Sequence, residues 1–143
     1  MIQIKIILFF CLLLTSPLLG QTNKAIKHPI DIKLEKCLSI DSNQTTFGMI
    51  QCSSIAKNEW DEELNKYYNL LLTKLNVDEK QKLKNTQRYW LIYRDNELSF
   101  SGTMYYNMEG TMWRVAAAGR SCDIVKERAL ELKNYYDVLT FDK

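Results

Sequence analysis

The sequence has few of the residues on which most enzyme and metal chemistry depends. It contains one histidine, His28, and its four cysteines include no Cys-x-x-Cys pair, so we expect no metal site. No glycine-rich loop suited to phosphate is present, and His28 has no recognisable serine or cysteine nucleophile motif beside it. These absences favour a protein that uses no cofactor and is not an enzyme.

A pair of carboxylates, as in glycoside hydrolysis, is the remaining route to catalysis. Asp95 and Glu97 are candidates, but residues two apart on a helix point in different directions. With 17 acidic residues in the chain, such pairs also arise by chance. We therefore interpret both carboxylates as structural.

The chain also lacks a marked excess of charge of either sign. It has 19 basic and 17 acidic residues, a formal net charge of +2, and the basic residues are scattered. The densest set, Lys80, Lys82 and Lys84, alternates along one helix turn and is typical of a solvated face. Because nucleic-acid binding usually needs a basic patch, we expect no nucleic-acid partner.

Residues 1–20, MIQIKIILFFCLLLTSPLLG, contain a single basic residue, Lys5, followed by an apolar run, and they end on Gly20. The run is shorter than the roughly 20 apolar residues needed to span a bilayer, which predicts a cleaved secretory signal. No cysteine follows Gly20, so we expect a periplasmic or secreted protein that is not a lipoprotein and has no stable membrane insertion after cleavage. Residues 21–143 would form one domain; an uncleaved membrane anchor is the alternative.

Three cysteines follow the predicted signal: Cys37, Cys52 and Cys122. Outside the cytoplasm they can oxidise, and an odd number leaves one without an intramolecular partner. A bridge between Cys37 and Cys52 would staple a short N-terminal segment to the helix that follows. Such a loop of about fifteen residues corresponds to roughly 3 kcal/mol in the chain-entropy model.

Helical periodicity dominates the rest of the chain. Apolar residues recur at steps of three or four from Met49 to Leu75, which predicts one long helix with Thr45 or Thr46 as its N-cap. Asn76-Val77-Asp78-Glu79 has the form of a capping box, so a second helix should run from Val77 to about Phe100. The tight turn between them favours an antiparallel hairpin.

A loop, SGTMYYNMEGT, is predicted at residues 101–111 between Gly102 and Gly110, and a final helix from about Met112. The run from Ala116 to Gly119 should allow close approach of helices. His28-Pro29 opens a short helix to Leu38. The predicted fold is all-α: a small bundle of three main antiparallel helices, plus a short N-terminal helix stapled by a disulfide.

The segment QRYWLIYRDNEL, residues 87–98, places Gln87, Leu91, Arg94 and Leu98 on one stripe. A stripe that faces a core does not normally carry a glutamine and a guanidinium. We interpret Arg94 as lying between helices and donating to a carboxylate, with Trp90 covering the pair against Trp60. The candidate acceptors are Asp31, Asp61 and Asp95. A partner-binding hot spot is the alternative.

Five segments in this order resemble the lysozyme-inhibitor LprI-like domain: HPIDIKLEKC, TTFGMIQC, AKNEWDEELNKYYNLLLTKL, QRYWLIYRDNE and RALEL. The resemblance covers nearly all of the chain after residue 20. It implies a small helical exported bacterial protein, in a family whose namesake is a lipoprotein reported to inhibit lysozyme. The residues of its structural motif would be Trp60, Asp61, Asn65, Gln87, Trp90, Arg94, Asp95 and Arg128.

The resemblance also bears on the cysteines. It supports a Cys37–Cys52 bridge. Many relatives have a cysteine after the Arg-Asp-x-Glu motif, apparently paired with one in the last helix, where this sequence has Leu98. Cys122 is therefore left as the odd thiol, which we expect to be buried and inert.

The resemblance implies a non-catalytic inhibitor that occludes the cleft of lysozyme or a related peptidoglycan hydrolase. A protruding loop with polar and aromatic groups suits a concave, carboxylate-lined cleft, and residues 41–46 and 101–111 both qualify. The candidate partner-binding residues are Tyr105, Tyr106, Met108, Glu109 and Asp41. The alternatives are an immunity protein against a cell-wall-degrading toxin, a structural or stress-related envelope protein, and an unrecognised hydrolase.

Overall fold

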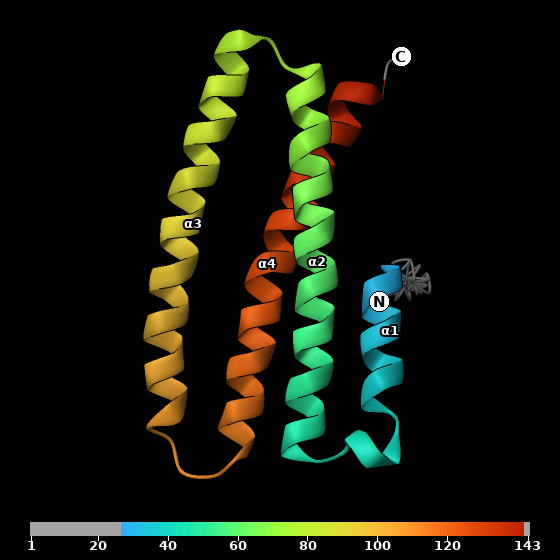
Figure 1. Ribbon diagram of the computed structural model, residues 1–143, viewed down its shortest axis with the longest axis vertical. Helices are drawn as coiled ribbons and strands as arrows, with labels where there is room; N and C mark the ends of the chain where they lie inside the picture. The colour runs from blue at the N-terminus through green and yellow to red at the C-terminus, as the bar shows by residue number, and fades with distance from the viewer. Residues whose placement is uncertain (1–26, 142–143) are drawn as a thin grey trace, which may run out of the picture.

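The computed structural model describes residues 27–141 and contains five helical elements in that range (Figure 1). The predicted signal lies outside the described residues. In chain order the elements are α1 (Pro29–Leu38), the short 3-10 helix η1 (Asp41–Asn43), α2 (Thr46–Lys74), α3 (Val77–Tyr106) and α4 (Met112–Thr140). The all-α prediction is confirmed, with three long helices and one short N-terminal helix.

The first two α-helices begin at side-chain caps. His28 precedes α1, and its Nδ1 accepts a hydrogen bond from the backbone N–H of Ile30 at 3.3 Å. Thr45 precedes α2, and its hydroxyl oxygen accepts from the N–H of Gly48 at 3.1 Å. The Cys37–Cys52 disulfide joins the end of α1 to the second turn of α2, which confirms the predicted staple.

The turn between α2 and α3 is the predicted capping box. The N–H of Glu79 donates to Asn76 Oδ1 at 3.0 Å, and the N–H of Asn76 donates to Glu79 Oε2 at 2.9 Å. These two bonds satisfy free donors at the start of α3 and let the chain reverse over two residues. Helices α2 and α3 therefore run antiparallel, as predicted (Figure 1).

Helix α3 continues to Tyr106, so the prediction that the loop begins at residue 101 is wrong. Gly102 does not interrupt the helix, and the hydroxyls of Ser101 and Thr103 donate to backbone carbonyls one turn earlier. The connection to α4 is thereby shortened to residues 107–111. Gly110 has φ of +95°, a conformation that side chains disfavour, and it makes this tight connection possible.

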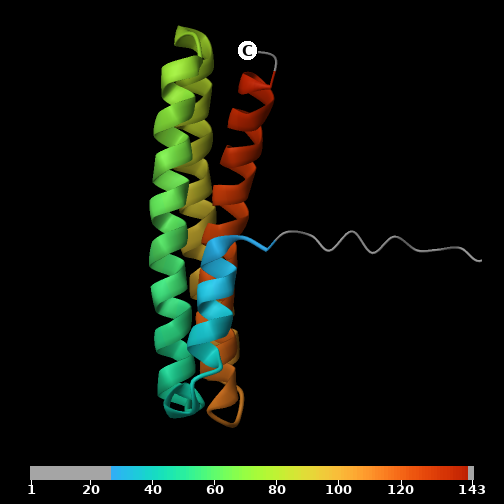
Figure 2. The ribbon, with the colours of Figure 1, turned by 90° about the vertical axis from the view of Figure 1, so that its right-hand side faces the viewer.

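The core lies mainly between α2 and α4, which run side by side, while α1 covers the lower half of α2 (Figures 1 and 2). Its buried side chains are Ile30, Ala56, Trp60, Leu64, Leu71, Cys122, Ile124, Val125, Ala129 and Leu132. Helix α3 packs against α4, and the apolar side chains that it contributes are only half-buried, among them Leu83, Trp90 and Leu98. It is the peripheral helix of the bundle.

Two expectations about α4 have different outcomes. Cys122 is a free, buried thiol, as expected. Gly119 has no atom within 4 Å of the place where a Cβ would lie, so the predicted close approach of helices is wrong at that residue. Ala117 and Ala118 line an open groove instead of a contact. Among residues 27–141, no helix is both long enough and apolar enough to cross a membrane.

Candidate functional site

The two segments that the sequence singled out for partner binding lie at the same end of the bundle (Figures 1 and 2). The hydroxyl of Thr46, at the start of α2, donates to the hydroxyl of Thr111, before α4, at 3.1 Å. We call residues 40–47 and 106–114 together the loop end. Two loops separated by 65 positions in the sequence thus form one continuous surface.

The first half of the loop end is held rigidly. Asn43 Nδ2 donates to the carbonyl of Cys37 at 3.0 Å, and the disulfide ties that residue to α2. Gly48 packs so closely that a Cβ there would lie 2.6 Å from the Cα of Asn43. Asp41, the first residue of η1, is exposed on this fixed turn. Its carboxylate is therefore presented to solvent by a rigid backbone.

The second half of the loop end, residues 106–114, contains exposed side chains and is supported by a stacked aromatic pair. Tyr105 is half-buried in the last turn of α3 and stacks on Trp113, with ring centroids 6.0 Å apart and an interplanar angle of 19°. Tyr106, Met108 and Glu109 are exposed. Tyr105 and Tyr106 lie on a helix rather than in a loop, because α3 continues further than predicted.

Sequence reasoning missed several apolar residues of the loop end. All are exposed, and all lie at helix starts or turns: Ile40, Phe47, Met112 and Trp113. Their signal is that none lies on the apolar stripe of a helix, although each is large and apolar. Exposed apolar side chains that cluster in this way mark interaction surfaces.

A groove of about 270 Å³ opens beside Tyr106. Its lining combines small and larger residues of α2, α3 and α4: Ile50, Leu98, Ser101, Gly102, Tyr106, Arg114, Ala117, Ala118 and Ser121. The guanidinium of Arg114 makes no ion pair with any residue between 27 and 141, whereas Asp41 and Glu109 provide negative charge nearby. The loop end therefore offers groups of both signs around apolar side chains.

The segment 87–98 holds α3 on α4, but not through the arginine that was predicted. Arg94 Nη2 binds Asp95 at 2.8 Å, an ion pair between sequence neighbours with Asp95 largely exposed. The buried arginine is Arg128 of α4, whose Nε donates to Gln87 Oε1 at 3.0 Å. The interhelix role assigned to Arg94 therefore belongs to Arg128.

Tryptophan packing also differs from the prediction. Trp60 is buried against His28, with ring centroids 4.3 Å apart, rather than against Trp90. Trp90 lies beside Arg94, whose guanidinium is 5.4 Å from the ring centroid. Helices α2 and α3 make little direct contact for such a tryptophan pair, because each packs mainly on α4.

The remaining polar residues of the motif have local partners. Asn65 Nδ2 donates to the carboxylate of Asp61 at 3.0 Å, one turn apart on α2. Asp31 binds Lys126 of α4 at 2.7 Å and so holds α1 against the core. Glu97 accepts from Arg120 at 3.1 Å, which satisfies one of the two carboxylates considered for catalysis. These contacts support the structural interpretation of the acidic residues.

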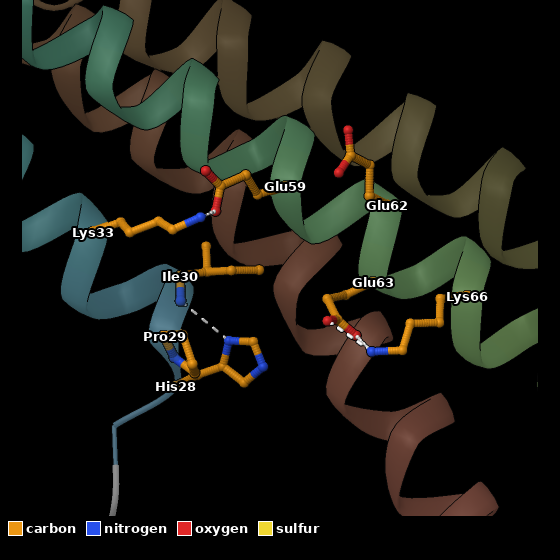
Figure 3. A pocket seen from close by; sticks show the side chains of 8 residues that line it. All are labelled: His28, Pro29, Ile30, Lys33, Glu59, Glu62, Glu63 and Lys66. Atoms are coloured by element: carbon orange, nitrogen blue, oxygen red, sulfur yellow. Dashed lines mark hydrogen bonds and ion pairs between the residues drawn. The ribbon is translucent and has the colours of Figure 1, made fainter.

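A second, larger groove of about 570 Å³ lies between α1 and α2 (Figure 3). Its charged residues are paired with one another: Lys33 with Glu59 and Lys66 with Glu63, each at 2.9 Å. Figure 3 shows Glu62 pointing away from both pairs. Between residues 27 and 141 no group of three His, Cys, Asp or Glu side chains is placed to hold a metal ion. This groove is a solvated ionic surface beside the cap of α1.

The fold and the loop end together define a small helical module with a disulfide-fixed end and exposed aromatic and methionine side chains, an arrangement typical of protein–protein recognition. Residues 37–132 match the family model described as lysozyme inhibitor LprI. The chain belongs to the LprI lysozyme inhibitor family.

A solved structure is similar as well. The crystal structure of an uncharacterized protein from Burkholderia thailandensis superimposes with a TM-score of 0.76 at 30% sequence identity. The match covers 82% of this chain and 58% of that protein, so this chain spans just over half of the longer molecule. A comparison with curated proteins found no match.

Proposed function

We propose that this chain is an exported, non-catalytic inhibitor that occludes the active cleft of lysozyme or a related peptidoglycan hydrolase. Membership of the LprI family carries the proposal, since it suggests lysozyme inhibition. The loop end supplies the surface. It projects from the narrow end of an elongated bundle, a shape suited to entering a concave cleft (Figure 2).

The chemistry of the loop end suits such a target. Tyr106 and Met108 offer apolar contact, while Asp41 and Glu109 match the basic surface common to lysozymes. Arg114 has no ion-pair partner in the described chain and is available for a carboxylate of the cleft. Tyr105 acts by holding Trp113 in place. These assignments extend the family match to named residues.

Export is part of the same proposal. Residues 1–20 would be removed as a secretory signal, and residues 21–143 would act as one domain in the periplasm or outside the cell, without a lipid anchor. The Cys37–Cys52 disulfide supports this location, because such bonds form and persist mainly in oxidising compartments.

Titration of muramidase activity tests the proposal. The protein purified from the periplasm is added to animal-type and bacterial lysozymes acting on cell-wall substrate. We expect saturable, stoichiometric inhibition of at least one of them. The absence of both inhibition and binding across the panel would contradict it.

A triple variant tests the surface. Tyr106→Ala, Met108→Ala and Glu109→Ala together should weaken inhibition by about 100-fold or more, because exposed aromatic anchors carry most of the binding energy in such interfaces. Helicity measured by circular dichroism should be unchanged. The control is Val77→Ala with Val138→Ala, two exposed residues at the opposite end, which should inhibit like the wild type. Equal inhibition by the triple variant would remove the loop end from the mechanism.

A further inference from the structure

Helix α3 carries a second apolar stripe that faces away from the core. Tyr89, Ile92, Tyr93, Phe100 and Met104 recur at helical spacing and are 64%, 54%, 52%, 66% and 40% exposed. Over about 22 Å of helix, at roughly 1.5 Å per residue, the stripe contains no charged residue. Its polar members are Asn96 and Thr103. We call these seven residues the outer stripe of α3.

The outer stripe is unusual for a surface helix. One face of α3 already packs on α4 through Trp90, Leu98 and Ser101. A helix that is apolar on two faces normally has a partner on each. Nothing between residues 27 and 141 covers the outer stripe, and Figure 1 shows α3 at the edge of the bundle with α4 on one side only. Monomeric proteins seldom leave so long an apolar surface uncovered.

We propose that the outer stripe binds the outer stripe of a second copy of this chain, with the two α3 helices antiparallel. The three aromatic residues of the stripe and Met104 favour this occupant, because their spacing is the same in both directions. The pairs Tyr89 with Met104 and Tyr93 with Phe100 share one midpoint, between residues 96 and 97. A two-fold axis there places these four large side chains opposite one another across the two copies, as an isologous interface requires.

Asn96 lies beside this axis and suits it. Its Nδ2 donates to the carbonyl of Ile92 at 2.8 Å, which fixes the amide and leaves a second N–H and the Oδ1 for another group. Across the axis, the group available is the amide of Asn96 in the second copy, which can donate and accept in return. A single asparagine inside an apolar helix pair sets its register and orientation.

The area is sufficient for a dimer. Large side chains of this kind bury on the order of 150–250 Å² each, so five that are about half exposed offer on the order of 500 Å² per copy. Two copies would bury roughly 1,000 Å², the lower limit for a specific interface. The loop end is not involved, so this interface leaves the proposed hydrolase-binding surface free in both copies.

Sedimentation and light scattering of the protein purified from the periplasm test the dimer. We expect twice the chain mass at micromolar concentration. Tyr93→Glu with Phe100→Glu should reduce it to the mass of one chain, since these side chains face each other and would bring like charges together. The matched control, Val138→Glu with Phe141→Glu, alters an exposed residue near the end of α4 and the exposed residue that follows the helix, and it should remain a dimer. A monomeric wild type, or dissociation of the control alone, would overturn the proposal.

Cysteine cross-linking tests the orientation, because the only free thiol among residues 27–141, that of Cys122, is buried. In a Cys11→Ser background, Asn96→Cys should form a disulfide-linked dimer under mild oxidation. Tyr89→Cys should not, since in the antiparallel pair the two copies of residue 89 are about 22 Å apart. The double variant Tyr89→Cys with Met104→Cys should cross-link again. Efficient cross-linking of Tyr89→Cys alone would overturn the antiparallel arrangement.

The inhibition assay separates this interface from the hydrolase surface. Tyr93→Glu with Phe100→Glu should inhibit lysozyme to the same extent per chain as the wild type. If the wild type is itself monomeric and this variant has lost inhibition, the outer stripe binds the hydrolase rather than a second copy. The dimer proposal would then be wrong, while inhibition by the wild type would still stand.

Discussion

The side-chain oxygen of Gln87 on α3 accepts a hydrogen bond from Nε of Arg128 on α4 at 3.0 Å. Arg128 is only 4% exposed, and its Nη1 also binds Glu131. Burial alone would raise the pKa of Glu131, but hydrogen bonds from Arg128 and Tyr135 lower it below its ordinary value. Helix α3 is thus held on the core by this hydrogen bond as well as by apolar side chains. A hydrogen bond is directional, so it also fixes the position of α3 along α4.

Gln87→Leu should therefore destabilise the fold. The change leaves the buried Nε of Arg128 without its acceptor, and an unpaired buried donor costs about 1–3 kcal/mol. Urea unfolding followed by circular dichroism measures the difference. Gln81→Leu is the control, because Gln81 is exposed and bonds only to Asn85 on the same helix. Equal stability of the two variants would show that the contact does not hold α3.

The sequence specifies most of the helices because their signals are local. The caps at Thr45 and Asn76 act over three or four residues, and the apolar periodicity of α2 comes directly from its buried face. The sequence predicts that α3 ends at about Phe100, whereas the helix continues to Tyr106. Gly102 and the polar residues around it are weak helix formers, but Ser101 is buried against the bundle, and that tertiary contact extends the helix.

The site was harder to predict because it depends on how distant segments pair. Asp41 and Met108 were identified from composition, but nothing local indicates that their two turns share one end of the bundle. Likewise, Arg94 and Arg128 both lie on helix faces that include apolar residues, and only the packing of α3 on α4 decides which is buried. Composition, periodicity and the family resemblance brought these residues into consideration, but only the fold assigns their contacts.

Loss of the disulfide should destabilise the domain and loosen the loop end. Cys37 and Cys52 are 15 positions apart, and closing a loop of that length contributes about 3 kcal/mol in the chain-entropy model. Cys37→Ser with Cys52→Ser should lower the free energy of unfolding by about that amount. If Asp41 binds the hydrolase, inhibition should weaken as well under conditions where the variant is still folded. An unchanged unfolding transition would contradict the stabilising role.

Two glycines in helices should respond oppositely to alanine. Gly48→Ala places a Cβ 2.6 Å from the backbone of Asn43, so η1 must move, and we expect a loss of about 1–3 kcal/mol. Gly119→Ala meets no atom within 4 Å and removes a flexible residue from the middle of α4, so it should stabilise by about 0.5–1 kcal/mol. Thermal unfolding of both variants beside the wild type measures the signs. A stabilising Gly48→Ala would show that η1 does not pack as described.

The buried thiol of Cys122 should make stability depend on pH in the alkaline range. Burial, and in second place the charge of Asp123, raise the pKa of Cys122 from 9.0 to about 11. Between these values the unfolded chain ionises its thiol while the folded chain keeps it protonated. The stabilisation present below about pH 9 is therefore lost as the pH rises to 11, by about 2–3 kcal/mol.

Comparison with Cys122→Ala isolates this contribution, because lysines and tyrosines titrate in the same range in both proteins. As the pH rises from 8 to 11, the free energy of unfolding should fall more steeply for the wild type than for Cys122→Ala. Alkylation gives an independent measure: because the thiolate is the nucleophile, the buried Cys122 should react with iodoacetamide at pH 8 only as fast as the domain opens. Rapid labelling of the native protein would show that the thiol is accessible and that its pKa is not raised by burial.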